Sequence, residues 1–313
     1  DVSKASGITA PGERYGLSVT TLDYDHDGWP DIYVAVDSQA SILYRNKGDG
    51  TFQDTGVETG VAYSEDGREQ AGMGTSAADY DGDGLLDLVK TNFIDDTPNL
   101  YRNNGDGSFT ENTVPAGLGR TTKFLGWGTA FTDYDNDGWP DVFMVNGHVY
   151  PDVRDASFNM RRLLYRNTAN GRFADVSMTS GDAVKAEFSS RGVVEADFDN
   201  DGNMDLLVTN MNEKPSLLHN NGTGHGHWIT LRLEGTKSNR SAIGARVTVY
   251  AGTRRLVNEV RSGSTFMSQS DLRLHFGLGA LDAIEKIEVE WPSGPKGMYH
   301  AKVDQIVSLV EGK

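Results

Sequence analysis

The sequence predicts an all-β protein in which β-propeller blades come first and a small β-sandwich follows. The main observation is a stretch of the form Asp-x-Asp-x-Asp-Gly-x-x-Asp that occurs four times, beginning at Asp23, Asp79, Asp133 and Asp197. Successive copies lie 56, 54 and 64 residues apart, and short runs of small, β-branched or aliphatic residues flank each copy. Repeats of about 40–60 residues made of short strands are typical of propeller blades.

Each repeat contains a succession of candidate strands. A run of small and apolar residues precedes each aspartate stretch, at residues 16–22, 72–78, 126–132 and 192–196. A β-branched or aliphatic run follows it, at residues 32–36, 88–91, 142–145 and 206–209. A third run begins at Leu43, Leu100, Leu164 and Leu217, and turn signals then lead to Phe52, Phe109 and Phe173. The small residues of the first run suit a crowded innermost strand.

The two ends of the repeat array leave alternatives open. The fourth repeat stops at residues 220–222 and lacks the strand that carries a Phe in the other three repeats. Residues 1–8 match residues 175–181, which follow the Phe of the third repeat. The first residues either supply the missing strand of the last blade and close a ring, or belong to a longer array. Four blades would be the minimum for a ring, so we expect further blades, upstream or on another chain.

No repeat continues beyond Trp228, and the remaining residues are expected to form short strands. The candidates are residues 229–233, 245–250, 256–260, 272–276, 284–291 and 305–310. Alternation of Ile229, Leu231 and Leu233 with polar residues indicates one buried face. Six short antiparallel strands suggest a compact sandwich. We therefore expect propeller blades at residues 1–224 and a sandwich at residues 225–313.

The four aspartate stretches have the spacing of cation-binding loops. Side chains at positions 1, 3 and 5 share the inside of a tight turn, the Gly at position 6 permits the turn, and Asp at position 9 closes the cage. The backbone carbonyl of position 7 adds an oxygen. An EF-hand is excluded because position 12 is Val34, Lys90, Met144 or Val208 instead of Glu. We expect about four Ca²⁺ ions, with ligands Asp23, Asp25, Asp27, Trp29, Asp31; Asp79, Asp81, Asp83, Leu85, Asp87; Asp133, Asp135, Asp137, Trp139, Asp141; and Asp197, Asp199, Asp201, Asn203, Asp205.

Composition limits the remaining function classes. The net charge is −16, and without the sixteen loop aspartates the other 29 acidic residues would balance the 29 Lys and Arg. The lack of a Lys/Arg cluster argues against a nucleic-acid partner. The absence of Cys excludes disulfides, thiolate metal sites and a Cys nucleophile. No apolar run approaches the roughly 18–20 residues of a membrane span. Weak calcium loops work where calcium is plentiful, so we expect an extracellular, cell-surface or periplasmic location.

The loops, with their Leu-Tyr-Arg-Asn followers, resemble FG-GAP/VCBS-type repeats. The C-terminal part is similar to an ASPIC/UnbV domain at residues 238–247, 268–279 and 290–294. This pairing resembles the cartilage acidic protein family and its bacterial relatives. The resemblance covers essentially the whole chain and implies a calcium-binding propeller, typically seven-bladed, of which the chain resembles the C-terminal half. It implies no established catalytic residue.

Three functions remain as hypotheses. The first is a non-enzymatic, extracytoplasmic module in which calcium rigidifies propeller loops that bind a protein or a glycan. The second is an enzyme, or a subunit of one, that acts on a glycan or a secondary metabolite at the mouth of the propeller channel. The third is a structural subunit of an extracellular assembly. The sequence contains no catalytic motif that singles out an active-site residue.

Overall fold

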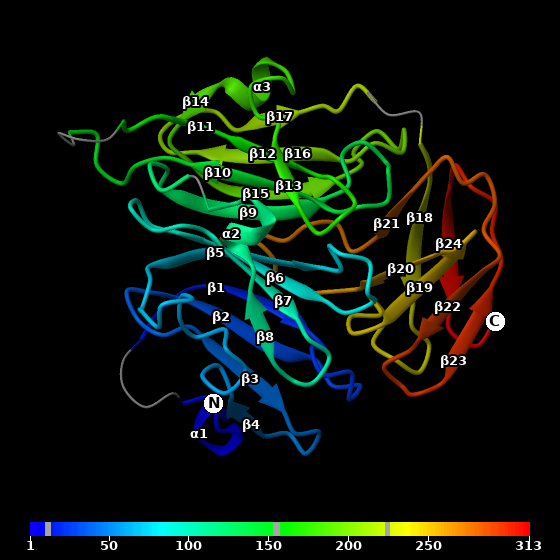
Figure 1. Ribbon diagram of the computed structural model, residues 1–313. Coiled ribbons are helices and arrows are strands. Elements are labelled where there is room, and N and C mark those ends of the chain that lie inside the picture. Colours follow the sequence, from blue (N-terminus) through cyan, green and yellow to red (C-terminus); the bar gives the residue numbers. More distant parts are fainter. Residues whose placement is uncertain (10–13, 120, 153–156, 223–225) are drawn as a thin grey trace.

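A computed structural model describes residues 1–9, 14–119, 121–152, 157–222 and 226–313. Four small antiparallel sheets succeed one another in chain order, and two further sheets from the C-terminal part lie beside them (Figure 1). The predicted all-β architecture of propeller blades and a following β-sandwich is therefore confirmed.

Each of the first four sheets contains one repeat and is called a blade below. Blade 1 consists of β1 (Tyr15–Leu22), β2 (Asp31–Asp37), β3 (Ile42–Asn46) and β4 (Phe52–Asp54). Blade 2 consists of β5 (Gly72–Ala78), β6 (Asp87–Asn92), β7 (Asn99–Asn103) and β8 (Phe109–Glu111). Blade 3 consists of β9 (Gly126–Thr132), β10 (Asp141–Asn146), β12 (Leu163–Asn167) and β13 (Phe173–Asp175). Blade 4 has the three strands β15 (Ser190–Ala196), β16 (Asp205–Asn210) and β17 (Ser216–Leu218).

Short elements connect or extend the blades. The two-residue strands β11 (Met160–Arg161) and β14 (Glu187–Phe188) pair with each other. The described part of the blade region also contains three single-turn helices: α1 (Ser3–Ser6), α2 (Thr113–Ala116) and α3 (Asp182–Lys185).

The innermost strands β1, β5, β9 and β15 lie side by side in that order, and glycine allows them to approach closely. A Cβ on Gly74 would lie 2.3 Å from the carbonyl oxygen of Trp127 on the next blade. A Cβ on Gly128 would lie 2.9 Å from the carbonyl oxygen of Arg191. The innermost strands are crowded, as their small residues predicted, because the backbones of neighbouring blades pack directly against each other.

Residues 1–8 lie on the first blade and not on the last. Gly7 lies against the Phe52 carbonyl of β4, and Ile8 packs on the cluster of Val36, Ile42 and Tyr44. The alternative in which the first residues supply the missing strand of blade 4 is therefore wrong. The first residues lie on blade 1 because Ile8 packs against an apolar cluster there. Blade 1 is at the opposite end of the array from β17 (Figure 1).

The C-terminal sheets form a sandwich around one apolar core. One sheet has the order β21 (Leu274–Gly279), β18 (His227–Glu234) and β24 (Gln305–Val310). The other has the order β20 (Arg254–Glu259), β19 (Arg246–Ala251), β22 (Lys286–Glu290) and β23 (Lys296–Tyr299). The core includes Ile229, Val247, Ile287 and Trp291. The expected boundary between residues 224 and 225 lies outside the described residues.

The expectation that all sandwich strands are antiparallel is wrong for one pair. β18 and β24 run parallel, with Ile229 opposite Gln305 and Leu233 opposite Leu309. A hairpin turn imposes antiparallel pairing on neighbours in the chain. These two strands begin and end the sandwich, so no hairpin constrains their relative direction.

The close approach of β5 to β9 leads to a stability prediction. Gly74→Ala is expected to lower the free energy of unfolding by about 1–3 kcal/mol, because backbone atoms on both strands would have to move. Gly16→Ala is the matched control, since its Cβ would meet only the Val34 side chain, at 3.0 Å. Urea denaturation followed by tryptophan fluorescence would measure both. Equal losses in the two variants would contradict the proposed role of interblade backbone contact.

Candidate metal centres

Each aspartate loop joins the first and second strands of its blade and is shaped by its own carboxylates. In the first loop, the Asp23 carboxylate accepts the backbone N–H groups of Asp27 at 3.1 Å and Gly28 at 2.9 Å. The glycine at position 6 of the four loops has φ between 80° and 89°, in the left-handed region. A side chain at this position would be strained, which explains why the repeat keeps Gly there.

The aspartate at position 9 is the first residue of the second strand and is buried in every loop. Asp31 accepts the N–H of Tyr24 at 3.2 Å and that of Asn46, on the third strand, at 2.7 Å. The corresponding residues Asp87, Asp141 and Asp205 accept the same pair of backbone donors. This carboxylate therefore ties its loop to the third strand of the blade.

A basic residue from the third strand lies against positions 3 and 5. Arg45 Nε is 2.6 Å from Asp25 Oδ2, and its Nη2 is 3.2 Å from Asp27 Oδ2. Arg102 and Arg166 make the same two contacts in the second and third loops. In the sequence, this arginine is recognisable only as part of the repeated Leu-Tyr-Arg-Asn run. Its constant position in the third strand was the signal that it belongs to the site.

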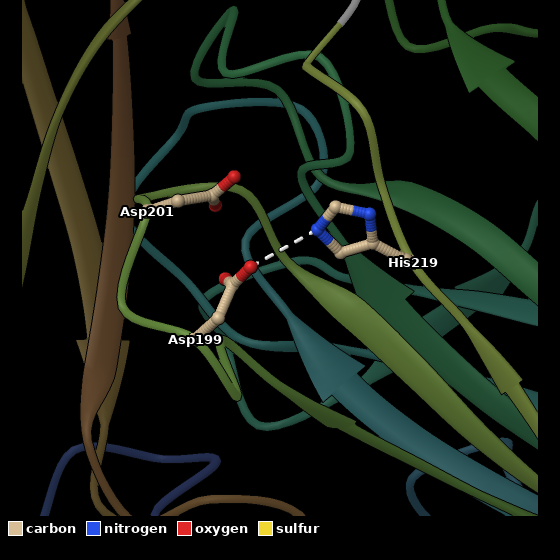
Figure 2. Close-up of side chains that lie close together, drawn as sticks. All are labelled: Asp199, Asp201 and His219. Carbon is tan, nitrogen blue, oxygen red and sulfur yellow. Dashed lines mark hydrogen bonds and ion pairs between the residues drawn. The ribbon is translucent and has the colours of Figure 1, made fainter.

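The fourth loop has histidine in place of this arginine. Figure 2 shows His219 facing Asp199, with Nε2 3.1 Å from Oδ2, while Asp201 lies across the loop. One potential ligand atom each from Asp199, Asp201 and His219 lies within 4.8 Å of the others. All three residues are exposed, so this is the most solvated of the clusters.

The loop carboxylates converge as a hard-cation site requires. In each loop, three carboxylates bring one oxygen apiece within 4.8 Å of one another: Asp23, Asp25, Asp27; Asp79, Asp81, Asp87; Asp133, Asp135, Asp141; and Asp197, Asp199, Asp205. Oδ1 of Asp25 and Oδ1 of Asp135 are buried and have no hydrogen-bond partner among the described residues. Unpaired carboxylate oxygens in an oxygen-rich cluster fit Ca²⁺. The position-7 carbonyls of Trp29, Leu85, Trp139 and Asn203 remain predicted ligands.

Burial makes the negative charge of these loops costly. Desolvation, as the largest cause, raises the pKa of Asp31 to about 8 and that of Asp141 to about 9. It likewise raises the pKa of Asp133 to about 8, with the neighbouring charge of Asp137 adding to the shift. Desolvation destabilises the ionised form of these carboxylates unless a proton or a cation neutralises the charge.

The C-terminal sandwich contacts every loop through a charged side chain. Arg246 donates to the Gly84 carbonyl, Arg254 donates to Asp137 O at 2.6 Å and Gly138 O at 2.5 Å, and Arg273 donates to Asp197 O at 2.9 Å. Glu259 accepts the backbone N–H of Asp23 at 3.2 Å and pairs with Arg246 at 3.0 Å. The loops thus form the surface on which the sandwich docks.

A segment between β20 and β21 covers the innermost strands. Thr265 N donates to Thr75 O of β5 at 2.6 Å, Thr265 O accepts the Ser18 hydroxyl of β1, and Asp271 N donates to Glu195 O of β15 at 3.0 Å. A cavity of about 100 Å³ remains there. The second hypothesis placed a site at the mouth of the propeller channel, and this segment contacts three of the innermost strands, β1, β5 and β15.

Comparison with known proteins identifies the repeats. The family described as "FG-GAP-like repeat" matches residues 23–90, 79–144 and 145–208, which together span more than half of the chain. The chain belongs to the FG-GAP-like repeat family. The family "ASPIC and UnbV" matches residues 235–313, so the resemblance of the C-terminal part is also confirmed.

Relatives of this FG-GAP-like repeat protein share the same combination over a longer chain. Cartilage acidic protein 1 of Homo sapiens is 29% identical over 322 residues, covering 99% of this chain and 46% of the relative. The Mus musculus protein of the same name is 27% identical over 318 residues, covering 99% of this chain and 47% of the relative. The chain therefore spans about half the length of these relatives.

Solved structures offer only a distant likeness. An Agrocybe aegerita lectin that recognises non-reducing terminal N-acetylglucosamine aligns with 82% of this chain and 68% of its own, at TM-score 0.37 and 18% identity. The rhamnogalacturonan lyase YesW aligns with 97% of this chain and 75% of its own, at TM-score 0.35 and 14% identity. TM-scores this low support no conclusion about function.

Docking of the sandwich on the loops can be tested at Arg254. Arg254→Ala removes two hydrogen bonds to the third loop and the stacking of the guanidinium 4.5 Å from the Trp139 ring. We expect a loss of about 1–3 kcal/mol in the free energy of unfolding, since hydrogen bonds to charged groups are worth about this much. Hydrogen exchange should also become faster at residues 133–141. Arg232→Ala, at an exposed position of β18, is the control, and an equal effect there would refute the assignment.

Proposed function

We propose that the chain is a calcium-binding interaction module that works outside the cytoplasm. Each of its four loops holds one Ca²⁺ through the aspartates at positions 1, 3, 5 and 9 and the carbonyl of position 7. The observation that carries this proposal is the fourfold recurrence of converging, desolvated carboxylates, two of them with a buried unpaired oxygen. A divalent cation bound there supplies the positive charge that these groups lack.

Calcium would also order the surface between the blades and the sandwich. Backbone carbonyls of the loops accept hydrogen bonds from Arg246, Arg254 and Arg273 of the sandwich. These carbonyls face the sandwich only while the loops keep their turn conformation. Extracellular calcium sites often have Kd of about 10⁻⁴–10⁻³ M. At about millimolar calcium, each such site would add about 0.4–1.4 kcal/mol of stability. Four such sites would together stabilise the docked arrangement appreciably.

The extracytoplasmic location and the protein or glycan partner are parts of the same proposal. Weak sites fill only where calcium is abundant, and the relatives are named as cartilage proteins. None of the helices in the described residues is long and apolar enough to cross a membrane.

A role as a subunit of a larger assembly is the second candidate function, and a specific feature of blade 4 favours it. Leu207 and Leu217 are 41% and 55% exposed. Their counterparts on blade 3, Phe143 and Leu164, are 0% and 5% exposed because blade 4 packs on them. Another blade, or another chain, would bury this face of blade 4 in the same way.

The calcium proposal predicts a reversible effect on stability. Adding millimolar CaCl₂ to metal-free protein is expected to raise Tm by about 5 °C or more, and EDTA is expected to reverse the change. Differential scanning calorimetry would measure both steps. No response of Tm to calcium would rule out the proposed role.

Stoichiometry tests which residues bind the ion. Isothermal titration of the native chain should give about four Ca²⁺, and the double substitution Asp133→Asn with Asp135→Asn should remove one of them. Asp66→Asn is the matched control, because Asp66 is an exposed aspartate outside the four loops. If the double variant kept all ions, the third loop would not be the site proposed.

A further inference from the structure

The outer strand of a blade is anchored by a phenylalanine that inserts against the preceding blade. Phe109 of β8 lies against Tyr24 of the first loop, with ring centroids 5.8 Å apart. Phe173 of β13 lies against Tyr80 of the second loop, with ring centroids 5.6 Å apart. Both phenylalanines are 7% exposed. The two contacts show the same arrangement one repeat apart.

The pocket around Phe173 is built from two blades. Phe173 belongs to an apolar cluster that contains residues of blade 3, of blade 2 and of the segment after blade 2. These residues are Ala78, Tyr80, Val89, Leu100, Ala116, Val142 and Tyr165. The backbone also approaches closely, because a Cβ on Gly117 would lie 2.7 Å from the Phe173 carbonyl oxygen.

Between blades 3 and 4 the corresponding place is a cavity of about 540 Å³. Its lining includes the residues one repeat further along, namely Thr132, Tyr134, Phe143, Leu164, Ser180, Leu206 and Leu218. Gly181 takes the place of Gly117, and no heavy atom of the described chain lies within 4 Å of where its Cβ would be. The pocket is therefore formed, but among the described residues no outer strand of blade 4 places a phenylalanine in it, as β13 does with Phe173 in blade 3.

The backbone beside this cavity is also ready to pair. In the described part of the chain, β17 is the edge strand of a three-stranded sheet. In blade 3, the outer strand places Phe173 opposite Asn167 and Asp175 opposite Tyr165. Asn220 and Leu218 occupy the equivalent positions in blade 4. A strand added in this register would place its Phe opposite Asn220, next to the cavity.

We propose that this pocket, lined by Tyr134, Leu164, Ser180, Leu206 and Leu218, is a strand-acceptor site. Its occupant is an extended partner segment of the type Phe-x-Asp or Phe-x-Glu, supplied from outside residues 1–313. The segment pairs antiparallel to β17 and buries its Phe ring against Tyr134. The three outer strands of the chain itself, which read Phe-Gln-Asp, Phe-Thr-Glu and Phe-Ala-Asp, define this chemistry. Strand addition of this kind gains backbone hydrogen bonds from the edge and specificity from the pocket.

A peptide taken from the chain tests the proposal. Fluorescein-labelled Gly-Arg-Phe-Ala-Asp-Val-Ser, the sequence of residues 171–177, should bind the full chain saturably at one site per molecule. The same peptide with Phe173→Ala should bind about tenfold or more weakly, because the buried aromatic anchor is lost. Fluorescence anisotropy measures both. Absence of saturable binding, or equal binding of the two peptides, would overturn the proposal.

A second pair of measurements locates the binding. Ser180→Trp fills the cavity and should weaken peptide binding about tenfold or more, whereas Met178→Trp, at a position 59% exposed and outside the lining, should leave it unchanged. With the native chain, the peptide should slow hydrogen exchange at residues 216–220. Sedimentation equilibrium tests whether a second copy of the chain occupies the pocket instead, because it measures the oligomeric state. A stable dimer that shuts out the peptide would refute a separate partner segment, as would unchanged exchange at β17.

Discussion

The structure depends on how sixteen carboxylates are neutralised within four short loops. Position 1 is held by backbone N–H groups of the same loop, and position 9 by N–H groups of the loop and of the third strand. In loops 1–3, positions 3 and 5 pair with an Arg of the third strand, and in loop 4, position 3 pairs with His219, just after that strand. These contacts connect the loop to the first three strands of its blade. The same contacts therefore neutralise charge and hold the sheet together, and a bound cation would strengthen both effects.

The four loops are not equivalent, because their surroundings differ. Loop 3 lies between neighbouring blades and beneath the sandwich, and burial raises the pKa values of Asp133 and Asp141 strongly. Loop 4 lies at the end of the array, where Asp199, Asp201 and His219 are all exposed. Its position-9 residue Asp205 also has a raised pKa from desolvation, but within the described residues no further blade follows blade 4. Solvent therefore screens part of the negative charge in loop 4, whereas loop 3 depends on protein groups and, in the proposed calcium-bound form, would depend on a cation as well.

The blades could be predicted from sequence because their determinants are local. Gly at position 6, Asp at position 9 and the alternation of apolar residues act within one repeat, and four repetitions remove the ambiguity of any single copy. The parallel pairing of β18 with β24 and the contact of Arg254 with the third loop could not be predicted. Both join residues far apart in the chain, and no turn or period encodes such contacts. The position of Ile8 on blade 1 was missed for a related reason, since similarity to residues 175–181 identifies the type of segment but not the blade that receives it.

Repeat arrays are stabilised mainly by contacts between neighbours, so terminal repeats carry surfaces that inner repeats bury. Blade 1 covers part of its outer face with residues 1–8, which act as the trailing segment of a preceding repeat would. The C-terminal part of the chain covers part of blade 4, because Arg273 contacts the loop of blade 4 and Asp271 contacts β15. Blade 4 still presents Leu207 and Leu217 to solvent and an edge strand beside a preformed pocket. The sandwich therefore secures the loop end and inner strand of the last blade, while its outer edge has the shape and chemistry to receive one more strand.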